Sequence, residues 1–316
     1  NQDTAINQDL RGIIPYDPQT LSVPFLYLWL KSIADLIVSE GTGATVQGVK
    51  LTFIKSLQVP LPPLPEQRRI VAILDKAFEG IDKAIANTEK NLANARELFE
   101  SYLNEVFTNK GNGWKEKTLG QVCDLFQGLA INKSTKHLLV KKSELPLLRI
   151  KDLRDGTEEQ YVAMEGFPKN AEVFPEDIIY TRTGQIGLVF RGRRGVLHNN
   201  CFKVVPRIEL SRGYFFWWLQ EPSFKRTIVR LASRAAQPDI THILFKAQRI
   251  QLPPMQYQTN AVNKIEKLYN DIKQLEDMYK QKVSGLIGLK QSLLQKAFAG
   301  ELTANPEPVI KEEAIA

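Results

Sequence analysis

Two stretches of sequence decide how this chain is organised: VPLPPLPEQ at residues 59–67 and IQLPPMQYQ at residues 250–258. They lie 191 residues apart, and the same offset continues without a gap as far as Phe107, which pairs with Phe298. A chance match of two prolines would not carry its flanking residues with it. The pattern therefore indicates an internal duplication.

The offset extends upstream as well, where residues 13–15 pair with residues 204–206. On this alignment Asn1 corresponds to about position 192, so the first copy contains no counterpart of Trp114–Arg191. We therefore expect one complete unit and one partial unit that lacks about 78 leading residues. The absence of an initiator Met is consistent with a chain truncated at its N-terminus.

A long helical pattern follows each proline-rich stretch, with apolar or small residues at alternating spacings of three and four. This seam consists of Val71, Leu74, Phe78, Ile81, Ile85, Thr88, Leu92, Ala95, Phe99, Tyr102 and Val106 in the first copy, and of Ile265, Leu268, Ile272, Leu275, Tyr279, Lys282, Leu286, Leu289 and Leu293 in the second. An isolated helix could not bury such a seam, so we predict an antiparallel helix pair. The alternative is that each helix packs on its own globular domain.

The segment Trp114–Arg249 has a different pattern. Short apolar runs between Gly and Pro residues predict strands at 147–150, 177–180, 186–190 and 202–205, and helices are predicted at 214–219 and 224–231. The fold class is therefore α/β (mixed α+β) globular domains joined by two long antiparallel coiled-coil helices. The predicted divisions are the rear part of a first domain (1–58), a long helix (59–112), a second domain (113–249), a second long helix (250–302) and a tail (303–316).

The composition of the 316 residues excludes several classes of protein. The 2 Cys cannot form a disulfide framework, and with 3 His they cannot complete a usual zinc site. The longest apolar stretch, Val23–Leu30, is much shorter than the roughly 20 residues of a membrane-spanning helix. We therefore expect a chain that is not embedded in a membrane.

Positive charge is concentrated in one region, because Tyr180–Arg249 contains 13 Lys and Arg but only 3 Asp and Glu. A local basic surface of this kind is typical of nucleic-acid binding. The candidate DNA-binding residues in and before this region are Lys133, Lys136, Arg149, Lys151, Thr181, Arg182, Thr183, Gln185, Arg191, Arg193 and Arg194. We expect Arg182 to contact a base and Arg193 to contact phosphates.

Each group of candidates also has a structural interpretation. Residues 191–195 are predicted to form a hairpin loop, which could be a solvated basic loop without function. Residues 181–185 could be a tight turn with one exposed arginine. Arg149 and Lys151 are predicted to share one face of a strand, although an ion pair between Arg149 and Asp152 is an alternative.

Motifs for catalysis are missing. The sequence contains no G-x-x-x-x-G-K-[ST] phosphate loop and no G-x-G-x-x-G after a predicted strand. The run Asn199–Phe202 lacks the prolines of the adenine-methyltransferase turn. No His lies beside a Ser or Cys in a way that suggests a nucleophile. We therefore predict a chain without an active site.

The motifs together resemble one family, the specificity subunits of type I restriction–modification systems. LPPLPEQRRIV at residues 61–71, followed by a long helix, resembles the family's conserved region. TRTGQIG at 181–187 resembles its strand turn. The segments 113–120 and 7–13 resemble the opening and the end of its target recognition domains, and 297–302 resembles its C-terminus. The second copy departs from the pattern at Gln256, where proline is usual.

This resemblance implies a function and a set of partners. Each target recognition domain would read half of a split sequence in double-stranded DNA, and the two helices would set the distance between the halves. The subunit itself would catalyse nothing. It would dock two methyltransferase subunits, which use S-adenosylmethionine, and restriction subunits, which use ATP and Mg²⁺, in the cytoplasm of a bacterium or archaeon. The alternative is a non-enzymatic coiled-coil scaffold whose basic face binds RNA or an acidic protein.

Overall fold

The computed structural model describes residues 10–41, 48–108, 111–233 and 238–303, which form two compact units. Unit 1 consists of the described parts of 1–93 and 275–316, and unit 2 consists of those of 94–274. The two long helices, α4 (Leu64–Thr108) and α10 (Met255–Phe298), each contribute residues to both units. Both helices were predicted from the heptad pattern.

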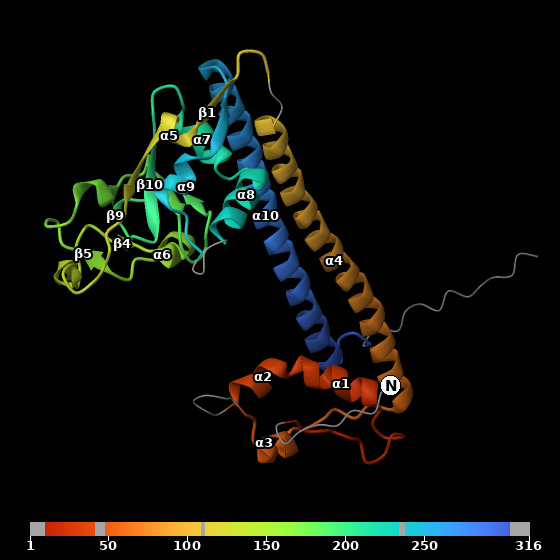
Figure 1. The fold of residues 1–316 in the computed structure, drawn as a ribbon. Helices are drawn as coiled ribbons and strands as arrows, with labels where there is room; N and C mark the ends of the chain where they lie inside the picture. The colour runs from red at the N-terminus through yellow and green to blue at the C-terminus, as the bar shows by residue number, and fades with distance from the viewer. Residues whose placement is uncertain (1–9, 42–47, 109–110, 234–237, 304–316) are drawn as a thin grey trace, which may run out of the picture. The chain divides into compact units, whose positions relative to one another are not determined.

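Unit 1 is built from helices (Figure 1). The short helices α1 (Val23–Ser32), α2 (Ala34–Ser39) and α3 (Leu51–Ser56) precede α4. Its core joins α1 to the start of α4 and the end of α10, and it consists of Phe25, Leu28, Ile70, Leu74, Leu294 and Ala297. Because the first turns of α4 meet the last turns of α10, the two helices run antiparallel in this unit.

Unit 2 contains four small sheets. The central one has the strand order β2 (Cys123–Gln127), β10 (Cys201–Pro206), β7 (Ile178–Thr181), β8 (Val189–Phe190), all antiparallel. A second sheet has the order β4 (Leu147–Leu148), β9 (Gly195–Leu197), β6 (Glu172–Val173), in which β4 and β9 are parallel. The remaining pairs are β1 (Lys115–Thr118) with β11 (Arg249–Leu252) and β3 (Leu139–Val140) with β5 (Tyr161–Val162).

Helices cover one side of the central sheet in unit 2 (Figure 1). These helices are α7 (Arg212–Trp218), α8 (Pro222–Ala232) and α9 (His242–Lys246). Unit 2 also contains the short helical segments α5 (Leu119–Val122), η1 (Lys136–Leu138), α6 (Ile150–Asp155) and η2 (Lys169–Ala171). The aromatic side chains of α7 connect the sheet to the long helices. Phe107 of α4 packs edge-on against Tyr214 at 5.2 Å, and Phe99 packs against Trp217 at 5.6 Å. The predicted helices at 214–219 and 224–231 are confirmed by α7 and α8.

A buried glutamine at the start of each long helix confirms the duplication. The side chain of Gln67 accepts from Ser22 N–H at 2.9 Å and donates to Thr20 O at 2.8 Å and Pro62 O at 2.9 Å. We call this set of three hydrogen bonds the glutamine clamp.

The second glutamine clamp is formed by Gln258 in unit 2. Its side chain accepts from Ser211 N–H at 2.8 Å and donates to Glu209 O at 2.9 Å and Pro253 O at 3.0 Å. Pro62 and Pro253 are equivalent at the offset of 191, and Ser22 and Thr20 are equivalent to Ser211 and Glu209 at an offset of 189, because the second copy is two residues shorter between 206 and 209. Both glutamine side chains are fully buried. A buried amide needs all of these bonds, so the two copies retain the same local architecture.

The second half of the predicted α10 seam is shifted. Lys282 and Leu289, which we placed in the seam, are exposed, whereas Val283 and Leu294 are partly or fully buried. A straight helix has 3.6 residues per turn, so its buried face drifts away from a strict seven-residue repeat. The predicted seam of α4 is confirmed, because each of its residues is buried or partly buried.

Candidate nucleic-acid interface

The candidate segment Thr181–Gln185 forms a tight turn at the end of β7. The hydroxyl of Thr181 donates to the carbonyl oxygen of Gln185 at 2.5 Å and accepts from Leu188 N–H at 2.8 Å. Thr181 is therefore buried inside the turn and serves to shape it. Gln185 is exposed, and Thr183 is partly exposed.

Arg182 is held by other residues of the same unit. Its Nε donates to Asp239 Oδ1 at 2.8 Å, its Nη2 donates to Oδ2 of that carboxylate, and its Nη1 donates to Gln127 Oε1 at 3.0 Å. The backbone joins the same segments, because Ile240 N–H donates to Arg182 O at 3.0 Å. Arg182 thus ties the turn to the end of β2 and to the segment before α9, with three of its five N–H groups used in this way.

The predicted basic strand face at Arg149 and Lys151 is wrong. The strand β4 ends at Leu148, and Arg149 is the N-cap of α6, so Lys151 lies in a helix. Asp152, at the third position of the helix, accepts from the backbone N–H of Arg149 at 3.3 Å and so caps the first turn. This cap starts a helix where the alternation of side chains had indicated a strand.

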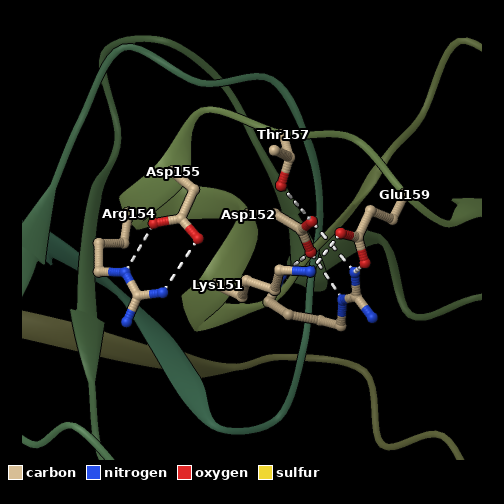
Figure 2. Close-up of polar contacts among 7 residues, drawn as sticks. Lys151, Asp152, Arg154, Asp155, Thr157 and Glu159 are labelled. Carbon is tan, nitrogen blue, oxygen red and sulfur yellow. Dashed lines mark hydrogen bonds and ion pairs between the residues drawn. The ribbon is translucent and has the colours of Figure 1, made fainter. Parts of the chain in front are cut away.

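An ion-pair network surrounds the start of α6 (Figure 2). Arg149 donates to the two oxygens of Asp152 at 2.6 and 3.1 Å and to Glu159 at 2.7 Å, and Lys151 also donates to Glu159. Burial alone would raise the pKa of Asp152, but the hydrogen bonds from Arg149 and Thr157 outweigh it and lower this pKa. The hydrogen bonds from Lys151 and Arg149 lower the pKa of Glu159. Both carboxylates are therefore ionised at neutral pH and offset the charge of the two predicted cations.

Arg154 was not among the predicted site residues, and it connects α6 to the turn. Its guanidinium donates to both oxygens of Asp155 at 2.7 and 2.9 Å (Figure 2) and to Gln185 Oε1 at 3.3 Å. Its side chain is half exposed. Arg154 lies beyond the predicted strand at 147–150, and helix α6 places it beside the exposed Gln185.

Residues 191–195 do not form the predicted hairpin loop. β8 pairs with β7 in the central sheet, whereas β9 pairs with β4 and β6 in a different sheet. The segment therefore crosses from one sheet to the other, and Gly192 N–H donates to Pro175 O at 2.8 Å on the way. β8 and β9 therefore do not pair with each other, and β9 pairs instead with strands that precede it in the sequence by more than twenty residues.

The three arginines of this crossing segment have different environments. Arg191 pairs with Glu266 of α10 at 2.8 Å, and its guanidinium lies 4.2 Å from the centre of the Phe216 ring. Arg193 donates to Thr157 O at 3.2 Å. Arg194 is exposed and has no ion pair among the described residues.

Lys133 and Lys136 lie in a loop that is ordered by its own side chains. Asn132 Oδ1 accepts from Ser134 N–H at 2.9 Å, and Thr135 donates through its hydroxyl to Ala130 O at 2.6 Å. Both lysines are exposed and are without an ion pair in the described part of the chain. The loop therefore presents two free cations on a fixed backbone.

The local charge of Tyr180–Arg249 is largely balanced by carboxylates from other segments. Seven of its 13 Lys and Arg form ion pairs: Arg182, Arg191, Arg193, Lys203, Arg207, Arg212 and Arg249. The buried Asp177, for example, lies 3.5 Å from both Lys203 and Arg212. The basic surface is therefore smaller than the sequence indicated.

The two cysteines belong to the core of unit 2. Burial raises the pKa of the Cys123 and Cys201 thiols to about 12. Within the described ranges, no group of three or more His, Cys, Asp or Glu residues could hold a metal ion. None of the described helices is long and apolar enough to span a membrane.

Comparison with known proteins links this arrangement to restriction systems. The family model described as type I restriction modification DNA specificity domain matches residues 1–93 and 111–283. The specificity subunit of the type I restriction enzyme EcoKI from Escherichia coli strain K12 is 25% identical, over 89% of this chain and 66% of its own length. The EcoBI specificity subunit from Escherichia coli is 22% identical, over 92% of this chain and 69% of its own length.

Solved structures share the fold. A chain from a structure described as the basis of complex assembly and conformational transition of the type I R-M system superposes with a TM-score of 0.77 at 21% identity, covering 90% of this chain and 73% of that chain. The HsdS subunit from Thermoanaerobacter tengcongensis gives a TM-score of 0.55 at 22% identity, covering 89% of this chain and 71% of its own. This chain thus spans about two thirds of the length of its relatives.

Proposed function

The chain belongs to the type I restriction modification DNA specificity domain family, and on this premise we propose that it selects the DNA sequence on which a type I restriction–modification complex acts. It catalyses no reaction itself in this proposal. S-adenosylmethionine, ATP and Mg²⁺ act in partner subunits, and the complex works in the cytoplasm of a bacterium or archaeon.

The duplicated glutamine clamp is the observation that carries the proposal. A protein that reads a split target needs two equivalent supports, one for each recognition domain. Gln67 and Gln258 hold the same hydrogen-bonded frame in the two copies, at the start of each long helix. Residues 113–249 supply a recognition domain on the second support. We propose that each complete domain reads one half-site.

Base edges are read, in this proposal, around the Thr181–Gln185 turn. The exposed amide of Gln185 and the half-exposed guanidinium of Arg154 offer donors and acceptors suited to the major groove. Arg182 holds the surrounding segments in place, which lowers the entropy cost of binding. Three of the predicted cations are exposed and have no ion pair among the described residues, which suits contacts with phosphates: Lys133, Lys136 and Arg194.

The long helices are proposed to dock two methyltransferase subunits, which restriction subunits join in the full complex. An apolar groove of about 370 Å³ supports this in unit 1, where Leu92 of α4 faces Val283 and Ile287 of α10. Met278 and Leu289 of α10 are also exposed. Apolar surface on a charged helix pair is typical of a protein–protein contact.

Mapping of methylated bases tests the proposal, in cells that express the gene with its partner subunits. We expect one half-site for each complete recognition domain, so a gene that encodes two complete domains should give two half-sites separated by a non-specific spacer. Inserting one heptad into both α4 and α10 adds about 10 Å to each helix, or about three base pairs of duplex. The spacer should lengthen by this amount and both half-sites should stay the same.

A matched control replaces one exposed heptad in each helix without changing its length, and it should leave the spacer unchanged. If the spacer kept its length after the insertion, the helices would not set the distance between the half-sites. A chain that binds RNA or acidic protein but no duplex DNA would instead support the scaffold alternative.

A further inference from the structure

Helix α8 carries positive charge that the protein does not neutralise. Lys225, Arg226 and Arg230 are exposed, and none of them has an ion pair in the described part of the chain. The only other cations of Tyr180–Arg249 in this state, among the described residues, are Arg194 and Lys246. α8 is therefore the densest group of free cations in the region that the sequence marks as basic.

The opposite side of α8 is fixed in the core. Phe224, Ile228 and Ala232 are buried among the side chains that connect the central sheet to α7. Since these residues recur every four positions, they fill one face of the helix, and Arg226 and Arg230 lie on the opposite face, whereas Lys225 lies at its edge near Gly187. The orientation of the basic face is thus set by packing.

Helix stability does not explain these cations. Arg230 lies in the last turn, where positive charge suits the helix dipole, but Lys225 and Arg226 lie near the N-terminus, where it does not. Arg226 and Arg230 are also spaced as i and i+4, so they repel each other. The helix starts instead from the carboxylate of Glu221, which accepts from Ser223 N–H at 2.7 Å.

The first copy of the repeat lacks the basic face. The helix that follows α1 in the first copy, α2, contains no Lys or Arg, and its only charged residue is Asp35. The glutamine clamp is common to both copies, whereas the charge of α8 belongs to one. It is therefore a property of this recognition domain and is not needed by the shared scaffold.

We infer that Lys225, Arg226 and Arg230 of α8 bind the phosphate backbone of duplex DNA, outside the bases that the domain reads. The inference rests on the proposed function. A guanidinium can donate two parallel hydrogen bonds to a phosphate, and two of the three residues are arginines.

The test is a triple variant, K225Q/R226Q/R230Q, of the full chain. Its binding to fluorescent duplexes is measured by anisotropy over a range of salt concentrations. Each lost phosphate contact lowers the slope of log affinity against log salt by about 0.9, so we expect a decrease of about 2 to 3. Affinity should fall at least about tenfold at 0.1 M salt for every duplex sequence, while the ratio between sequences stays the same.

The matched control is K264Q/K267Q/K273Q, which removes the same charge from exposed lysines of α10 in the same unit. It should bind within about twofold of the parent chain. Thermal unfolding of both variants checks that they fold, and the loss of repulsion should leave α8 intact.

The outcomes separate the two proposals. If the parent chain binds no duplex with a salt-dependent affinity, the proposed function and this inference both fail. If the parent binds but the α8 variant behaves like its control, only the assignment of α8 fails. It also fails if the α8 variant loses methyltransferase subunits in a pull-down while its DNA binding is unchanged, because the face would then bind protein.

Discussion

The two copies of the repeat share the glutamine clamp at the start of each long helix, but equivalent apolar residues near it are buried in one copy and exposed in the other. Leu252 is only 6% exposed in unit 2, whereas its counterpart in unit 1, Leu61, is 58% exposed. Val204 is buried in the central sheet, and the corresponding Ile13 is 46% exposed. The glutamine clamps nevertheless have the same partners in both units.

This difference separates local from long-range structure. The counterpart of β11 in the first copy, residues 58–61, forms no strand, because this sequence contains no counterpart of β1 in that copy. A strand needs a partner for its backbone groups, whereas a helix and its cap satisfy theirs locally. The helices therefore form in both copies, and so does the clamp, because each copy contains both of the segments that the clamp joins. The pairing of β1 with β11 forms in one copy.

The largest expected difference in stability between the two units comes from a substitution at Gly128 of unit 2, a residue that has no counterpart in unit 1. A Cβ atom there would lie 2.3 Å from His198 O and 2.5 Å from Leu197 O, which are backbone atoms that cannot move freely. We expect Gly128→Ala to destabilise unit 2 by about 3 kcal/mol or more. Hydrogen exchange measured by mass spectrometry should show the loss in unit 2 and leave the segments of unit 1 unchanged.

The glutamine clamp provides the second test. Gln258→Ala and Gln67→Ala each remove a fully buried amide and leave a partly buried N–H and two carbonyls without that partner, so each should cost about 1 to 3 kcal/mol in its own unit. Urea unfolding followed by unit-resolved hydrogen exchange measures both losses. Gln256→Ala, at an exposed position, is the control and should change stability by less than about 0.5 kcal/mol. Clearly unequal losses would show that the two clamps are not equivalent supports.

Alkaline pH should affect only one of the units, because both thiols lie in unit 2. The pKa of Cys123 and of Cys201 is raised to about 12 in the folded state, so unfolding favours loss of their protons above about pH 9. Stability should then fall with rising pH, by up to about 1.4 kcal/mol per pH unit for each thiol. Thermal unfolding at pH 9 and pH 10 measures the decrease, and C123A/C201A should reduce it. An equal decrease in that variant would rule out the thiols as its cause.

The smallest expected effect is an increase in stability, and it comes from substitutions in unit 1. Gly285 and Gly288 of α10 have open space where a Cβ atom would be, unlike Gly128. Replacing each by Ala should stabilise the helix by about 0.5 to 1 kcal/mol, because glycine loses more backbone entropy in a helix. The double variant should therefore unfold at higher urea concentration. A loss of stability would indicate that another group occupies this surface.

Much of the scaffold could be predicted from periodicity alone. The spacing of apolar residues located α4 and α10, and the 191-residue offset located the two equivalent frames. Prediction of the candidate site was less successful, because its contacts are between residues far apart in the sequence. Arg182 was recognised, but its partners Asp239 and Gln127 lie more than fifty residues away. The free cations of α8 were missed, since the sequence does not show which charges find a partner.

The sequence by itself determined the duplication, the two long helices and the family, because these depend on local periodicity and on motifs read along the chain. The tertiary structure alone decided which cations are free, since an ion pair depends on distance in space. It also decided where strands form, as β8 and β9 entered different sheets although only four residues separate them. Backbone hydrogen bonds are strong but short-ranged, so a strand forms only where folding brings a partner to it.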